Sequence, residues 1–275
     1  MSIPPQRYFV QRIGGANVDV GVLLPPGQSP HTFEPAAKQM IELSKARVFF
    51  GIGVPFEKQV AKKIEAAFEH LVVVDTGLGI DRSSSHASCN HEHGDTGGAA
   101  HEHGELDPHI WMNPRLVKSQ ARIICDELSR QDPARAEQYE VNLASFTADL
   151  NRIDEQLREL LEPLRGRAFL VYHPAYGHFA EAYGLRQVAV ETSGKPPAAK
   201  RMLELIRQAK ADGIRSIFVQ PQSSRTTAMT FARQIGAEVV VVDPLAEDYL
   251  DNLRGFASKI RDALGGPTAV SRVGQ

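Results

Sequence analysis

Four side chains that can bind a metal ion lie in separate segments of the sequence, and each stands beside a proline. They are His31, His109, His173 and Asp243. Proline fixes its own φ and restricts the residue before it, so the backbone around each side chain has little freedom to relax. Three imidazoles and one carboxylate form a tetrahedral set that suits Zn²⁺ at about 2.0–2.2 Å, whereas a Mn²⁺ site would contain more oxygen ligands. Singly, each histidine fits an ordinary loop position, but together the four favour a metal site.

The rest of the sequence alternates short β-branched runs with helical patterns, which is typical of an α/β fold with mostly parallel strands. Because His173 and Asp243 directly follow predicted strands, and ligands gather outside the carboxyl ends of parallel strands, we expect these two side chains to converge. Strands are predicted at residues 18–24, 48–52, 71–75, 168–172, 187–190, 216–219 and 238–242. Helices are predicted at residues 34–46, 56–68, 174–183, 197–211, 224–235 and 249–263, and another begins at Asn113-Pro114.

A long periodic segment over residues 133–164 separates the two halves. Roughly 30 helical residues would extend about 45 Å, enough to run along two lobes. We therefore predict an N-terminal lobe (1–132) and a C-terminal lobe (165–275), each with a mostly parallel sheet flanked by helices, joined by one long rigid helix (133–164). An ordinary surface helix of a single domain is the alternative. The apolar side chains of the segment recur every three or four residues, as on one helix face: Tyr139, Leu143, Phe146, Leu150, Ile153, Leu157 and Leu160.

Half of the ten histidines lie in a polar, glycine-rich loop predicted over residues 81–105. The motif His-Glu-His-Gly occurs there twice, at residues 91–94 and 101–104. Such a chain would bind divalent metals loosely and in varied geometries. A solubilising linker or an accidental tag-like run is the alternative, but the internal repetition favours a secondary metal site. Its members are His86, His91, His93, His101 and His103.

The composition and the remaining motifs exclude several classes of protein. The formal net charge of -2 indicates no nucleic-acid partner, and no apolar run reaches the length of about 20 residues that spans a bilayer. Two sparse cysteines, Cys89 and Cys125, form no disulfide framework or zinc knuckle. The sequence contains no GxGxxG turn, phosphate loop, GxSxG elbow or HExxH helix. Outside the metal set, His70 is expected at a helix end and His178 at the surface.

Segment by segment, the chain resembles the solute-binding proteins of zinc and manganese ABC importers, the ZnuA/TroA group. The resemblance covers nearly the whole chain, and its motifs are specific in combination. They are the stretches at residues 2–10 (SIPPQRYFV), 29–35 (SPHTFEP), 107–111 (DPHIW), 172–176 (YHPAY), 218–222 (FVQPQ) and 242–245 (VDPL). The family often has Glu before the proline of the fifth motif, where this chain has Gln220.

This resemblance implies two α/β lobes with one metal ion in the cleft between them, held by His31 and His109 from the first lobe and by His173 and Asp243 from the second. Members with a His-rich loop are zinc-selective, whereas manganese members tend to have Glu at the position of His173. Trp111 is expected to cover the site and exclude water. The implied function is high-affinity Zn²⁺ capture and delivery to a membrane ABC permease, without catalysis.

The resemblance also implies a periplasmic or cell-envelope location for a monomer that is not integral to the membrane. The N-terminal residues lack a signal segment, which we interpret as trimmed. A manganese-binding protein of the same type is the nearest alternative. A zinc hydrolase is a second alternative, because an open zinc position and a nearby general base would permit catalysis. A cytoplasmic metal-storage or chaperone protein is a third, favoured if Met1 is the natural start.

Overall fold

Each half of the chain contains a β-sheet whose strands are all parallel within the part of the chain that the structure describes. The computed structural model describes residues 1–83, 106–191 and 197–265. One sheet pairs β1 with β2, and the other has the strand order β4-β3-β5-β6. This arrangement confirms the α/β fold class. The strands are β1 (Val48–Gly51), β2 (Val72–Asp75), β3 (Ala168–Val171), β4 (Arg186–Ala189), β5 (Ser216–Val219) and β6 (Glu238–Val241).

The helices begin and end at residues that suit their termini. The side chain of Asn113 accepts a hydrogen bond from the backbone N–H of Arg115 at 3.0 Å, and Pro114 occupies the first turn of α4. Gly236 ends α8 in the left-handed conformation, at φ 71°. The helices are α1 (Pro4–Gly14), α2 (Ala37–Leu43), α3 (Glu57–Ala67), α4 (Pro114–Gln131), α5 (Ala136–Leu161), α6 (Gly177–Ala182), α7 (Ala199–Ala211), α8 (Arg225–Ile235) and α9 (Tyr249–Leu264).

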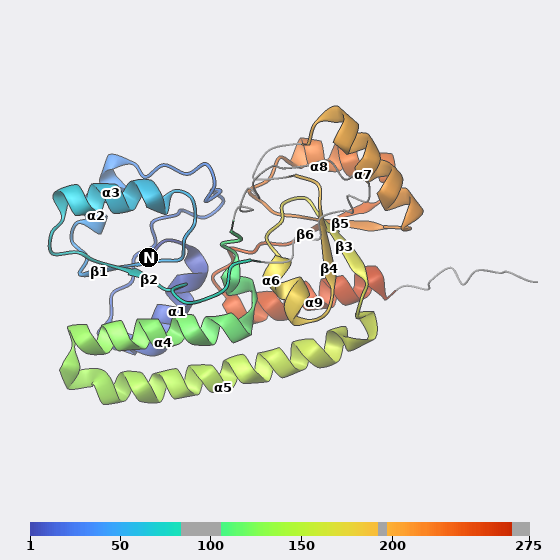
Figure 1. Cartoon of the computed structure of the whole chain (residues 1–275). Helices are drawn as coiled ribbons and strands as arrows, with labels where there is room; N and C mark the ends of the chain where they lie inside the picture. Colours follow the sequence, from blue (N-terminus) through green and yellow to red (C-terminus); the bar gives the residue numbers. More distant parts are fainter. Residues whose placement is uncertain (84–105, 192–196, 266–275) are drawn as a thin grey trace, which may run out of the picture.

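The long helix α5 runs beneath both groups of elements, beside α4 under the first half and beneath α9 under the second (Figure 1). Its 26 residues correspond to about 39 Å at 1.5 Å per residue. It packs against α1 and α4 from the first half and against α9 from the second. One continuous cluster of buried side chains includes residues of α1, α5 and α9, so the two halves share a core along this helix. Six of the seven predicted stripe residues are buried, and Leu160 is partly buried.

Two predictions for the first half were wrong. Residues 18–24 form no strand, because the backbone N–H groups of the successive residues Leu23 and Leu24 donate to Met1 and Ser2, whereas a strand ladder bonds through alternate residues. The helix predicted over 34–46 is shorter, since α2 covers Ala37–Leu43 and the residue before it, Ala36, has an extended backbone. The N-terminal helix α1, which has Pro4 and Pro5 in its first turn, was not predicted. Within the described residues, no helix combines the length and apolar character that crossing a bilayer requires.

Candidate metal centre

The structure brings three of the four predicted ligands together. His31, His109 and His173 each offer one ring nitrogen, and these three atoms lie within 4.8 Å of one another. The ring centroids of His31 and His173 are 4.7 Å apart, and those of His109 and His173 are 5.2 Å apart. The three residues come from three loops that are far apart in the sequence. Their convergence therefore forms a candidate metal centre.

His109 is fixed by a carboxylate two residues before it. Oδ1 of Asp107 accepts hydrogen bonds from the backbone N–H of His109 at 2.9 Å and from its Nδ1 at 2.5 Å. Both side chains are buried. Burial opposes ionisation of Asp107, but the charge and hydrogen bonds of His109 nevertheless hold the pKa of this carboxyl well below its ordinary value. The Asp-Pro-His sequence thus places a carboxylate against Nδ1 of the His109 ring.

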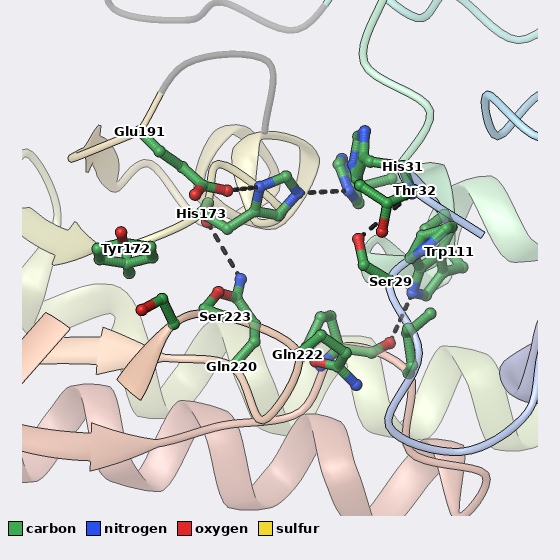
Figure 2. Close-up of a pocket in the computed structure, with 15 residues that line it drawn as sticks. Ser29, His31, Thr32, Trp111, Tyr172, His173, Glu191, Gln220, Gln222 and Ser223 are labelled. Carbon is green, nitrogen blue, oxygen red and sulfur yellow. Dashed lines mark hydrogen bonds and ion pairs between the residues drawn. The ribbon is translucent and has the colours of Figure 1, made fainter. Parts of the chain in front are cut away.

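His173 lies just past the end of β3 and is contacted by a residue just past the end of β4. Oε1 of Glu191 lies 2.5 Å from Nδ1 of His173, and about a tenth of each side chain is exposed. The two strands pair in parallel, and the backbone N–H of Glu191 donates to Tyr172 at 3.0 Å. Figure 2 shows Glu191 on one side of the His173 ring and His31 on the other.

The Nε2 atoms of His109 and His173 face each other in the cluster, and in each ring the other nitrogen, Nδ1, contacts a carboxylate. A carboxylate accepts a hydrogen bond from Nδ1–H, and an imidazole that carries its single proton on Nδ1 has a lone pair on Nε2. These two Nε2 atoms lie 3.3 Å apart. Two lone pairs at this separation form no hydrogen bond with each other. Two nitrogens on one tetrahedral Zn²⁺ at about 2.0–2.1 Å would lie about 3.3–3.4 Å apart, so the pair fits a shared cation.

His31 supplies a third ring nitrogen to the cluster. Its Nε2 is buried and has no hydrogen-bond partner among the described residues, and its backbone N–H donates to Oγ of Ser29 at 3.3 Å. Burial, followed by the positive charges that His173 and His109 would carry if protonated, lowers the pKa of His31 to about 3. Burial also lowers the pKa of His173, although Glu191 opposes this shift. Both rings are therefore neutral, as metal binding requires.

The cluster lines a pocket of about 210 Å³ that receives side chains from both halves of the chain. Trp111 is fully buried there, with its ring centroid 5.1 Å from that of His109. Its Nε1 donates to the carbonyl of Pro244 at 2.7 Å (Figure 2), and the Tyr249 hydroxyl donates to the Trp111 carbonyl at 2.7 Å. Trp111 therefore joins the loop after β6 to the loop that carries His109, and it forms an apolar wall of the pocket.

The predicted fourth ligand lies outside this cluster. Asp243 follows β6 as expected, but it is not one of the residues that the structure groups with the three histidines. Its Oδ1 accepts hydrogen bonds from Nε2 of Gln222 at 3.0 Å and from the backbone N–H of Leu245 at 2.9 Å. The carboxylate thus holds its own loop. Direct coordination by Asp243 stays a prediction.

The remaining predicted residues have separate outcomes. The loop histidines His86, His91, His93, His101 and His103, and Cys89 with them, lie outside the described residues. Cys125 is buried and free, as expected. His70 lies past α3, where its Nε2 is 2.8 Å from the Ser44 carbonyl. The expectation that His178 is a surface residue was wrong, because its side chain is buried against the Asp107 carbonyl, at 3.2 Å from Nε2.

Sequence reasoning missed the two carboxylates behind the rings. Asp107 stands in the same motif as His109, at a spacing that favours a side-chain bond to the backbone two residues on. Glu191 follows a strand of the same sheet as His173, so the rule that marked His173 and Asp243 also applies to it. Each signal was present in the sequence. Glu191 is 18 positions from His173 in the sequence, however, so their contact appears only in three dimensions.

The fold and the histidine cluster together define a two-lobed α/β metal-binding protein. Residues 1–263 match the family described as "ZnuA: Zinc-uptake complex component A periplasmic". The chain belongs to this family. Among solved structures, it is similar to "Crystal structure of ZnuA", with a TM-score of 0.86, 38% identity and coverage of 96% of this chain and 97% of that one.

Curated relatives agree with this assignment. The chain is 29% identical over 273 residues to "High-affinity zinc uptake system protein ZnuA" of Bacillus subtilis (strain 168), which covers 94% of this chain and 85% of that protein. It is also 29% identical over 252 residues to "Zinc-binding protein AdcA" of Streptococcus pyogenes serotype M3, with 88% of this chain and 49% of that protein covered. The chain thus spans about half the length of the streptococcal relatives that it matches.

Proposed function

We propose that the chain captures Zn²⁺ with His31, His109 and His173 and delivers it to a membrane ABC permease. The observation that carries this proposal is the pair of Nε2 atoms of His109 and His173, 3.3 Å apart, each on a ring whose Nδ1 is bonded to a carboxylate. Together with Nε2 of His31, which is buried and has no hydrogen-bond partner among the described residues, they supply three nitrogen ligands. The printed names of two relatives, a zinc-binding protein and a zinc uptake system protein, support Zn²⁺ as the ion that this chain binds.

We propose zinc rather than manganese because of the donor set. Imidazole nitrogen suits Zn²⁺, whereas Mn²⁺ favours carboxylate and carbonyl oxygen. The two nearest carboxylates, those of Asp107 and Glu191, have an oxygen engaged with Nδ1 of a ligand ring. Asp243 as the fourth ligand and the His-rich loop as a low-affinity collector or sensor remain parts of the proposal that rest on the sequence.

We propose a binding role without catalysis. A catalytic zinc needs an open position and a carboxylate or histidine that is free to move a proton. The position of Asp243 outside the cluster favours the hydrolase alternative, since three ligands leave zinc a fourth position. Glu191 and Asp107 oppose it, because each has a carboxylate oxygen bonded to a ring that would bind the metal. Membership of a transport family also supports the binding role.

The place and partners of the protein follow from the family. We propose a periplasmic or outer cell-envelope location and an inner-membrane ABC permease as the partner, with the chain acting as a monomer. The family description names a periplasmic zinc-uptake component, and one relative is named a "Zinc-binding lipoprotein AdcA". We also propose the division into lobes 1–132 and 165–275 connected by residues 133–164, which the packing of α5 against α1 and α9 supports.

A metal titration tests the central proposal. Trp111 is the single tryptophan of the chain, and it lies beside His109. Zinc binding at the cluster should change its fluorescence with one equivalent of Zn²⁺, and a competing chelator gives the affinity. Mn²⁺ should compete only at far higher concentration. Tight binding of Mn²⁺ with weak binding of Zn²⁺ would contradict the proposed cargo, and hydrolysis of test esters or peptides by the zinc-loaded protein would contradict the absence of catalysis.

A further inference from the structure

The geometry points to Glu191 as a positioning residue that sets the tautomer and the orientation of the His173 imidazole for metal binding. This inference rests on the proposed zinc site. Neither the resemblance nor the spacing of the predicted ligands marks Glu191. Its contact with Nδ1 of His173 is the shortest polar contact that His173 makes with any described residue, at 2.5 Å.

The backbone places the two side chains next to each other. Residues 186–189 of β4 pair with residues 168–171 of β3 in parallel register. Past the strand ends, the N–H of Val190 donates to Val171 and the N–H of Glu191 donates to Tyr172, both at 3.0 Å. These bonds tie Val190 and Glu191 to the two residues that precede His173. Glu191 therefore starts from a fixed backbone position, which is the condition for holding another side chain accurately.

The contact selects one of the two neutral forms of His173. With Glu191 accepting from Nδ1–H, Nε2 bears the lone pair and faces Nε2 of His109 at 3.3 Å. Without the carboxylate, the ring could carry its proton on Nε2 or rotate about its side-chain torsions. A proton on Nε2 would occupy the direction in which a metal ion has to bind. Carboxylates behind metal-binding imidazoles commonly act in this way.

Glu191 and Asp107 differ in the hydrogen bonds that their side chains make besides the one to a histidine ring. Asp107 bonds both the ring and the backbone of His109, so its removal would disturb the loop as well as the imidazole. Among the described residues, the Glu191 side chain bonds only the ring of His173, and the backbone of His173 is held separately by Nε2 of Gln220 at 3.1 Å. A substitution at Glu191 should therefore leave the local fold intact and release only the ring.

The experiment compares Glu191→Ala and Glu191→Gln with the parent chain. Glutamine retains an oxygen that can accept from Nδ1, whereas alanine has none. Glu181→Ala is a matched control, because Glu181 is an exposed glutamate on α6 of the same half. Zinc affinity is measured by chelator competition. The tautomer of His173 is measured in the metal-free protein by nitrogen NMR of labelled histidine, with His173→Ala to assign the signal.

Glu191→Ala should weaken zinc binding about 10–100-fold, the range found when such partners are removed. In the metal-free state it should convert His173 from a single Nδ1–H tautomer to a mixture. Glu191→Gln should keep the tautomer and lose less affinity, and Glu181→Ala should match the parent. The inference is overturned if His173 of the parent carries its proton on Nε2, if Glu191→Ala binds zinc like the parent, or if the glutamine and alanine variants lose equal affinity. If the parent itself bound no zinc, the proposed function would fail, while the tautomer measurement would still decide the role of Glu191.

Discussion

The Nε2 atoms of His109 and His173 lie 3.3 Å apart although 64 positions separate the two residues in the sequence. One residue precedes α4 in the first half of the chain, and the other follows β3 in the second half. The two nitrogens can lie this close only if the two halves of the chain keep a fixed position relative to each other. The shared core along α5 and the hydrogen bond from Trp111 to Pro244 provide this connection.

Replacing any one of the three histidines by alanine should remove the tight zinc site. Loss of a partner behind a ligand already costs about 10–100-fold, so loss of a ligand itself should exceed about 100-fold in affinity. Chelator competition on His31→Ala, His109→Ala and His173→Ala measures this loss. His70→Ala is the control, because His70 is exposed and bonds Ser44 far from the pocket. A histidine variant that keeps parent affinity would remove that residue from the ligand set.

Asp243→Ala should weaken zinc binding less than any of the three histidine variants. In this structure the carboxylate accepts from Gln222 and from the Leu245 backbone, so its loss should loosen the loop that forms one wall of the pocket. The same chelator competition gives the comparison. A loss as large as that of the histidine variants would instead show direct coordination, as the sequence predicted.

The metal-free protein should become less stable as the pH falls below about 6.5. The pKa of His31 is about 3 in the folded chain, against about 6.5 for an unperturbed histidine, so between these values the unfolded chain binds one more proton at this residue. The free energy of unfolding should therefore fall by about 1.4 kcal/mol for each pH unit on account of His31. Urea denaturation of the parent and of His31→Asn at several pH values measures the difference. Equal pH dependence of the two proteins would contradict the depressed pKa.

Trp111→Phe should lower the free energy of unfolding by about 1–3 kcal/mol, because the buried carbonyl of Pro244 loses its donor. The benzene ring retains most of the apolar contact beside His109, so zinc binding should survive. Denaturant titration measures the stability and chelator competition the affinity. Unchanged stability would show that the bond between Trp111 and Pro244 does not contribute to holding the two loops together.

Deletion of residues 86–103 should leave one tight zinc site and remove the weaker ones. The cluster of His31, His109 and His173 contains no residue of this segment. Calorimetry of the full and shortened chains counts the sites. Loss of the tight site on deletion would contradict the assignment of the cluster.

Prediction from the sequence was most successful where the pattern is local. The strand over 216–219 has the predicted bounds, and the α5 stripe is buried because a helical period places its apolar residues on one face. It failed for residues 18–24, which alternate like a strand but pair with no strand among the described residues; the backbone of Leu23 and Leu24 bonds Met1 and Ser2 instead. Alternation shows which side chains share a face, but it does not show whether a partner strand is present.

The sequence by itself determined the kinds of ligand and the fold class, since residue chemistry and periodicity are written directly in the chain. Only the tertiary structure decided that His31, His109 and His173 share one centre, that Asp243 bonds its own loop and that Glu191 lies behind His173. The reason is physical: a bond between side chains depends on strand pairing, on rotamers and on distances of a few ångströms. These quantities are set by the packing of the whole molecule.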